Sequence, residues 1–220
     1  MHREFVIELA PVDLMPHSVH LFLSQIAEGF WSRGAVVLNP GHVLQACPHP
    51  CLESVANGGK YPGDPYFDMK SAGIDSVSFQ EYHPKYPHEK YTVGLAGRPH
   101  SGPEFYINLA NNTLDHGPVE LLKKELGDRY SDYVRDTLGA NSDDKVLAPD
   151  PCFGKVVKGF EVVDKMAERM TWASLNMYSN ERRFDDSLLV RPVRMVSVTI
   201  LDSLDSNSGY GKGSEEHSEL

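Results

Sequence analysis

The apolar residues of the chain fall into short runs separated by Pro- and Gly-containing turns, which limits each secondary-structure element to a few residues. Alternation of apolar and polar side chains over about four to eight residues indicates a half-buried strand. Strands are therefore predicted at residues 4–10, 35–46 (two strands joined across Pro40-Gly41), 77–79, 91–95, 105–109, 152–157 and 193–201. No run approaches the roughly 20 apolar residues that a membrane-spanning helix needs.

Three segments carry apolar residues at helical spacing instead. The first starts near Pro16 and ends at Gly29, the second covers residues 119–138 with charges on its opposite face, and the third covers residues 160–170. Many short strands with a few helices favour a mainly β fold, in which a β-barrel is capped by helices.

At 220 residues the chain fits one domain with a sizeable core. Its net charge of -10 argues against nucleic acid as a partner, because phosphate binding needs clustered Lys and Arg. Residues 203–220 are rich in Ser, Gly and Glu and lack apolar periodicity, which predicts a disordered acidic tail. Because the first predicted strand begins close to residue 1, the chain is expected to be a piece of a longer polypeptide.

Several blocks of the sequence, in a matching order, resemble the cyclophilin family of peptidyl-prolyl cis-trans isomerases. The strongest block is Cys152-Phe153-Gly154-Lys155-Val156-Val157-Lys158-Gly159, with its continuation to Met166, which is similar to the family's Val-Phe-Gly-Lys-Val-Val-x-Gly stretch. The other similar blocks are residues 5–11, Phe22-Leu23, 40–45, 93–97, 101–107 and 196–201. The resemblance implies a closed antiparallel β-barrel over residues 3–202, with an additional helical insertion at 118–151.

The resemblance also implies a groove in which an arginine hydrogen-bonds near the prolyl nitrogen and carbonyl of a bound peptide, beside an apolar socket. Counting back from Pro40-Gly41, the position of that arginine is occupied by Val37, which has no hydrogen-bond donor. The remaining groove positions are His42, Gln45, Ala96, Gly97, Glu104, Tyr106 and Leu114. Of these, Gln45 and Ala96 keep the family's residue, whereas His42 and Tyr106 replace two phenylalanines of the socket.

These differences predict a pseudo-isomerase that holds a protein segment or a proline-containing peptide, with isomerase activity absent or very weak. The peptide is expected to contact His42, Gln45, Arg98 and Tyr106. One alternative is an active isomerase in which Arg98 or His42 supplies the missing donor. Another is a structural domain of a larger protein whose groove is filled by its own loops. No cofactor, nucleic acid or membrane contact is predicted.

The segment Cys47-Pro48-His49-Pro50-Cys51 leaves three interpretations open. Cys47, His49 and Cys51 are weak candidates for a zinc site, with Cys152, His83 or His88 as a fourth ligand. A Cys47–Cys51 disulfide is also open, although so short a loop risks strain. The favoured interpretation is a proline-stiffened loop with ordinary thiols, so the redox state of the compartment stays open.

Two further features have a simple interpretation beside a functional one. His83 and His88 lie in a Tyr- and Pro-rich loop and are predicted to be exposed turn residues. The apolar stripe of residues 119–138 is predicted to pack on the outside of the barrel, with partner binding as the alternative. Asn111-Asn112-Thr113 fits the N-glycosylation pattern, which leaves a secretory or organelle lumen open as the location.

Overall fold

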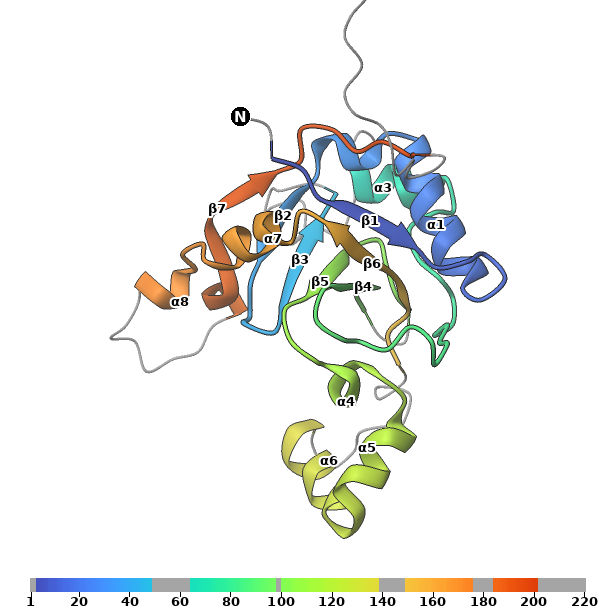
Figure 1. Cartoon of the computed structure of the whole chain (residues 1–220), viewed down its shortest axis with the longest axis vertical. Coiled ribbons are helices and arrows are strands. Elements are labelled where there is room, and N and C mark those ends of the chain that lie inside the picture. Colours follow the sequence, from blue (N-terminus) through green and yellow to red (C-terminus); the bar gives the residue numbers. More distant parts are fainter. Residues whose placement is uncertain (1–2, 49–63, 98–99, 139–148, 176–183, 202–220) are drawn as a thin grey trace, which may run out of the picture.

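The structure is a computed structural model that describes residues 3–48, 64–97, 100–138, 149–175 and 184–201. Its centre is one seven-stranded sheet in the order β1-β6-β4-β5-β3-β2-β7, and every paired neighbour is antiparallel (Figure 1). The strands are β1 (Val6–Leu9), β2 (Ala35–Leu38), β3 (Val43–Cys47), β4 (Thr92–Leu95), β5 (Phe105–Asn108), β6 (Cys152–Lys158) and β7 (Leu188–Arg194). Within the described part of the chain, β1 and β7 are the two edges, so closure of the sheet into a barrel stays a prediction.

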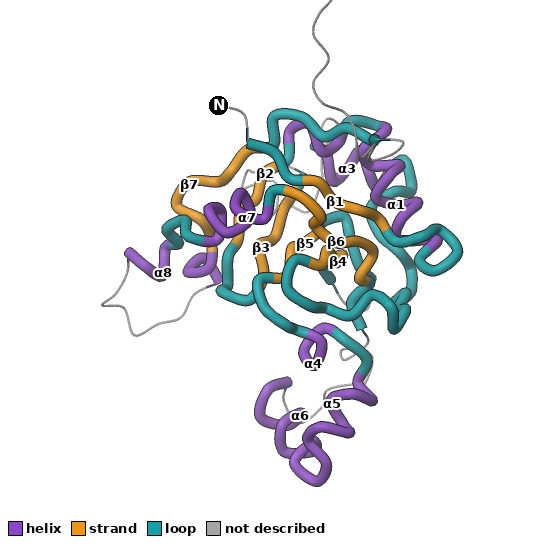
Figure 2. The backbone as a smooth tube through the Cα atoms, in the orientation of Figure 1, coloured by secondary structure: helices purple, strands orange, loops and turns teal. Residues whose placement is uncertain are grey.

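Helices cover the sheet on several sides (Figure 2). They are α1 (Pro16–Ala27), α3 (Pro65–Ser71), α4 (Thr113–His116), α5 (Val119–Leu126), α6 (Tyr130–Leu138), α7 (Phe160–Ala167) and α8 (Trp172–Leu175), with 3-10 turns η1 (Phe30–Arg33), η2 (Gly127–Arg129) and η4 (Phe184–Ser187). None of the helices in the described ranges is long and apolar enough to cross a membrane.

Two predicted strands differ from the structure. Around Val77 there is only an isolated bridge to Ser101. The final strand, β7, lies earlier than predicted, and residues 195–201 form no strand. Its sequence was not recognised because it contains Pro192, which lacks an N–H group for the ladder and is tolerated on an edge strand. The later alternation does not correspond to burial, since Val196 is 79% exposed.

One face of the sheet and α1 enclose the hydrophobic core. Phe22 of α1 packs against Phe105 of β5 and Phe153 of β6, with ring centroids 5.4 and 5.0 Å apart. The Trp31 ring lies 4.7 Å from that of Phe105, and its indole N–H donates to the buried Gln25 Oε1 at 3.0 Å. The apolar side chains thus exclude water while the polar atoms among them keep hydrogen-bond partners.

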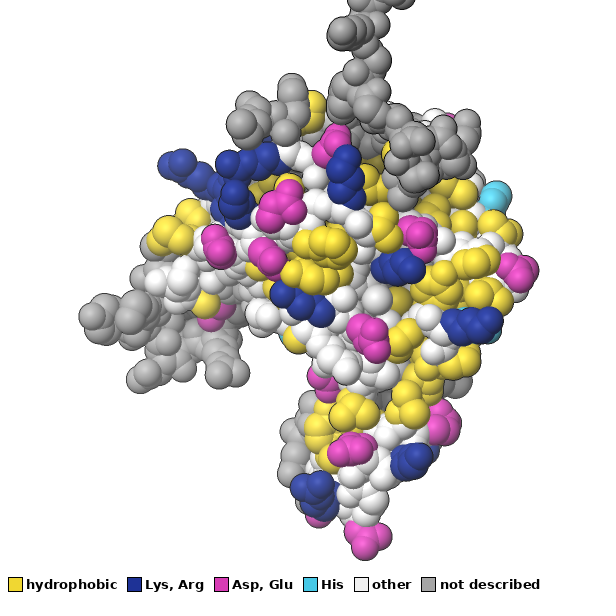
Figure 3. Space-filling view, viewed as in Figure 1, with side chains coloured by type: hydrophobic (Ala, Val, Ile, Leu, Met, Phe, Trp, Pro, Cys, Tyr) yellow, Lys and Arg dark blue, Asp and Glu magenta, His cyan; other side chains and the backbone are white. Residues whose placement is uncertain are grey.

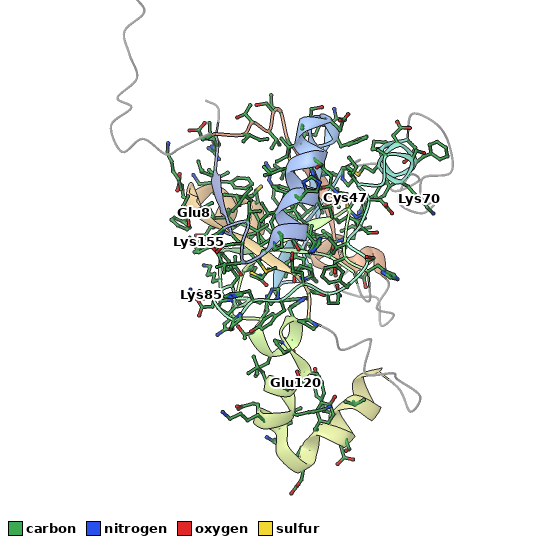
Figure 4. The ribbon with its side chains drawn as sticks, turned by 90° about the vertical axis from the view of Figure 1, so that its right-hand side faces the viewer. Glu8, Cys47, Lys70, Lys85, Glu120 and Lys155 are labelled. Carbon is green, nitrogen blue, oxygen red and sulfur yellow. The ribbon has the colours of Figure 1, made fainter. Side chains whose placement is uncertain are left out.

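The second predicted helix is two helices, α5 and α6, separated at Gly127, whose φ of 54° lies in the left-handed region. The predicted packing on the outside of the sheet is not what the structure has. Both helices extend away from one end of the sheet as an arm, residues 119–138, in both views of the ribbon (Figures 1 and 4). Leu122 is buried within it, whereas apolar and charged side chains are interspersed over its surface (Figure 3).

The N-terminus of α1 depends on a carboxylate from a distant loop. Its N-cap residue, Met15, has no side chain that can accept a hydrogen bond from the first turn. Glu81 does so instead: it accepts from the backbone N–H groups of His17 (3.1 Å) and Ser18 (2.8 Å), and from the Ser18 hydroxyl at 2.6 Å. A negative charge at this position also interacts favourably with the positive end of the helix dipole.

Replacing Glu81 by Ala should therefore lower the free energy of unfolding by about 2 kcal/mol, because buried N–H groups lose their acceptor. Urea denaturation followed by circular dichroism measures the change. The exposed Glu89 is the matched control, and Glu89→Ala should leave the midpoint nearly unchanged. Equal effects of the two substitutions would show that the Glu81 cap does not stabilise α1.

Candidate functional site

The predicted groove residues lie on the face of the sheet that is turned away from the core. Leu44 and Ile107 pair on the core side, while their neighbours Gln45 and Tyr106 pair with each other on the opposite side. We call this opposite side of β2, β3, β4 and β5 the groove face. It brings together the predicted positions Val37, Gln45, Glu104 and Tyr106, together with Cys47.

Val37 is packed into this face and is only 6% exposed. It belongs to a small apolar cluster with Ala35 and Cys47, separate from the main core. The pairing of β2 with β3 shifts by one residue between Val36 and Leu38, so Val37 lies at a bulge. The side chain at the position that the resemblance assigns to an arginine is therefore aliphatic and sealed from solvent.

A buried polar group closes one end of the groove face. The Tyr66 hydroxyl of α3 donates to Glu104 Oε1 at 2.7 Å, and Cys47 Sγ lies 4.0 Å from the same oxygen. Burial raises the pKa of the Glu104 carboxyl. Burial, followed by the Glu104 charge, raises the pKa of the Cys47 thiol to about 12. Figure 4 shows Cys47 inside the fold and Lys70 of α3 at its surface.

Burial thus keeps the Cys47 thiol protonated at neutral pH in the metal-free chain, and a protonated thiol is a poor nucleophile. The other two residues of the predicted cysteine–histidine site, His49 and Cys51, lie outside the described residues. Across the described ranges, no three His, Cys, Asp or Glu side chains are grouped so that they hold a metal ion.

The other end of the groove face is open. His42 is exposed there and Leu114 of α4 is 42% exposed, whereas the half-buried Ala96 and the exposed Gly97 lie at the Glu104 end, where the Ala96 N–H donates to the Glu104 carbonyl at 2.9 Å. The His42 ring stacks on His116 of α4, with centroids 5.5 Å apart and planes inclined by 27°. Partial burial and the neighbouring His116 lower the pKa of His42. Arg98, the candidate replacement donor, lies outside the described residues.

Next to this open end, four side chains form the Tyr106 cluster, which is defined as Tyr106, His88, His116 and Asp150. Asp150 Oδ2 accepts from the Tyr106 hydroxyl at 3.0 Å and from His116 Nδ1 at 2.6 Å. His88 Nδ1 lies 3.3 Å from the same hydroxyl, and His88 Nε2 donates to the Asp150 carbonyl at 2.9 Å. The cluster joins β5, α4 and the loop before β4 to Asp150, which lies two residues before β6.

Gly94 of β4 makes this arrangement possible. A Cβ atom built on Gly94 would lie 2.7 Å from both Cζ and the hydroxyl oxygen of Tyr106. The Tyr106 ring thus lies directly across the β4 backbone and carries its hydroxyl toward Asp150. Any side chain at position 94 would occupy this space.

Sequence reasoning missed most of this cluster. The prediction that His88 is an exposed turn residue is wrong, because its side chain is fully buried. His116 and Asp150 were not singled out, since they are separated by the whole arm and nothing local indicates their contact. Tyr66 was also missed. The available signal was the position of Asp150 two residues before the Cys152-Phe153-Gly154 block.

The chemistry that this face offers is hydrogen bonding and apolar contact. Its imidazoles, amide and carboxylates donate and accept, and Leu114 offers an exposed apolar surface. Among the described residues of this face, the carboxylate of Glu104 cannot donate a hydrogen bond when it is ionised, and the exposed Arg194 pairs with Ala35 across β2 and β7.

Comparison with known proteins agrees with the architecture. The model of the family described as cyclophilin type peptidyl-prolyl cis-trans isomerase/CLD matches residues 2–199. A crystal structure of a cyclophilin type peptidyl-prolyl cis-trans isomerase of Cryptosporidium parvum is similar in fold, with a TM-score of 0.53 and 13% identity over 91% of this chain and 92% of that one. A second structure of the same description, in the presence of the dipeptide Ala-Pro, has a TM-score of 0.47 and 14% identity over 87% of this chain and 92% of that one.

No curated protein sequence matches the chain. The family model, however, spans nearly all of its length. The chain therefore belongs to the cyclophilin-type peptidyl-prolyl cis-trans isomerase family.

Proposed function

We propose that this chain is a pseudo-isomerase: a cyclophilin-type domain that binds a protein or peptide segment at the open end of its groove face and has little or no isomerase activity. The observation that carries this proposal is the sealed, aliphatic Val37 in an apolar cluster with Ala35 and Cys47.

Proline isomerisation requires an amide with a rotation barrier of about 20 kcal/mol to twist. A catalyst lowers this barrier by donating a hydrogen bond or presenting a positive charge where the twisted amide develops electron density. Valine offers neither. The nearby carboxylate of Glu104 already accepts from the Tyr66 hydroxyl, and in its ionised form it would repel that density.

His42 is a poor replacement for the missing donor. Its lowered pKa keeps the imidazole neutral at pH 7, and its ring is occupied in stacking on His116. A neutral imidazole still donates one hydrogen bond, but it supplies no charge. The alternative of an active isomerase therefore rests on Arg98.

Peptide binding, unlike catalysis, does not need the arginine. At the open end, His42 and Gln45 supply hydrogen-bonding groups beside the exposed Leu114, a combination that suits an extended segment with an apolar residue. At the other end, α3 covers Cys47 and Glu104 through Tyr66. That cover favours a partial form of the structural-domain alternative, in which the chain's own α3 fills part of the groove.

The activity prediction is that adding the chain to a proline tetrapeptide leaves the cis-to-trans rate at its uncatalysed value. A protease-coupled assay that cleaves only the trans form measures this rate, with an active cyclophilin as the positive control. Turnover by this chain that disappears in Arg98→Ala would establish the active-isomerase alternative and refute the proposal.

The binding prediction concerns Leu114. Titrating the labelled chain with a proline-containing peptide should shift the amide signals of Gln45 and His42, and Leu114→Asp should weaken the affinity by about tenfold or more. Val12, which is 60% exposed on the β1–α1 connection, provides the matched control. Equal affinities of Leu114→Asp and Val12→Asp would rule out the open end as the binding surface.

A further inference from the structure

We propose that Tyr106 is a positioning residue. Its hydroxyl anchors Asp150, Asp150 orients His116, and His116 holds the His42 ring at the rim of the groove. The surface that a partner would contact therefore depends on a side chain that is buried below it. This inference deepens the proposed binding function and rests on it for its biological role. The geometry itself can be tested without any partner.

The hydrogen bonds of Asp150 tie the rim to the sheet. Its backbone N–H donates to the His116 carbonyl at 2.8 Å, while its carboxylate accepts from His116 Nδ1 and from the Tyr106 hydroxyl. Asp150 and Tyr106 are both buried, and His116 is mostly so. The direction of the His116 ring is therefore fixed by buried acceptors rather than by solvent.

The tautomers of the cluster follow from its partners. His88 Nε2 faces a carbonyl oxygen, so it must carry the proton, and in neutral His88 the Nδ1 atom is then an acceptor next to the Tyr106 hydroxyl. His116 Nδ1 faces a carboxylate and carries a proton for the same reason. The single proton of the Tyr106 hydroxyl goes to Asp150 Oδ2, and the Nδ1 atoms of His88 and His116 lie 3.3 and 3.2 Å from the same hydroxyl oxygen.

His42 is the outermost member of this arrangement. Its ring stacks on that of His116. The ionisable groups that act on it electrostatically are His116 and Asp115 of α4, and Asp150 and His88 lie on the other side of His116. Burial and His116 lower the pKa of His42, whereas Asp115 and a hydrogen bond to the Pro40 backbone oppose that shift. The stacked arrangement is therefore complete above the unfolded-state pKa of 6.5 and is lost as the pH falls through the lower folded-state value.

The test is an NMR titration of the histidine ring signals of the whole chain. In the native chain the pKa of His42 should lie below 6.5. In Tyr106→Phe, the Asp150–His116 pair keeps its mutual bonds but loses its hydrogen bond to β5, so the pKa of His42 should rise toward 6.5 and amide exchange in α4 should accelerate by about tenfold. Tyr91→Phe is the matched control, since the Tyr91 hydroxyl also bonds to an aspartate, Asp164, at 3.0 Å, but away from the rim.

A second variant displaces the ring without removing a polar group. Gly94→Ala places a methyl group where the Tyr106 ring lies, and it should shift His42 in the same direction as Tyr106→Phe. A folded Tyr106→Phe or Gly94→Ala chain whose His42 titrates as in the native chain would overturn the inference. In the native chain an ordinary pKa of His42 would also refute the stacked rim, whereas a lowered pKa alone reports burial of the ring and leaves the decision to the variants.

These outcomes are separate from those of the proposed function. Isomerase turnover, or failure to bind a peptide, would refute the pseudo-isomerase proposal and leave the positioning of His42 intact. An unresponsive His42 would refute the positioning and leave Val37 as the reason for weak catalysis.

Discussion

The pairing register of β3 with β5 decides which side chains enter the core and which reach the groove face. Leu44 opposite Ile107 closes the core, and Gln45 opposite Tyr106 defines the other side. Because successive side chains of a strand alternate, a slip of one residue would bury the polar pair and expel the apolar one. The hydrophobic effect therefore holds the register, and the groove face takes its composition from it.

Two groups of hydrogen-bonded polar side chains lie on that face, one at each end. At one end the Tyr66 hydroxyl of α3 and the protonated Cys47 thiol share one carboxylate oxygen of Glu104, and at the other a tyrosine, an aspartate and histidines lie together beside Gly94. Both groups keep their buried polar atoms hydrogen-bonded, which avoids the cost of leaving them unpaired. Neither places a cation beside Val37. In the proposed function, binding at the rim and weak catalysis are two consequences of this one arrangement.

The sequence predicted the family and most strands because these depend on local patterns. The Cys152–Met166 block and the Pro40-Gly41 turn carry both periodicity and spacing, so they located β6, α7 and the position of Val37. The edge strand β7 was predicted too far along the chain because a proline such as Pro192 argues against a strand.

Contacts between distant segments could not be predicted in the same way. His88 lies among Tyr, Pro and Lys, a composition typical of an exposed loop. Its side chain is nevertheless buried and donates to the carbonyl of Asp150, which follows the arm in the sequence. Glu81 caps α1 from a similar distance. A single sequence shows the periodicity of each element, but it does not show which distant loops form hydrogen bonds with one another.

The central claim is that Val37 is sealed on the groove face, and methyl proton distances in solution test it most directly. Nuclear Overhauser effects should connect the Val37 methyl groups to the Ala35 methyl group and to the β protons of Cys47. Contacts from the Val37 methyl groups to Leu44 and Phe105 would place this side chain in the core instead and contradict the account.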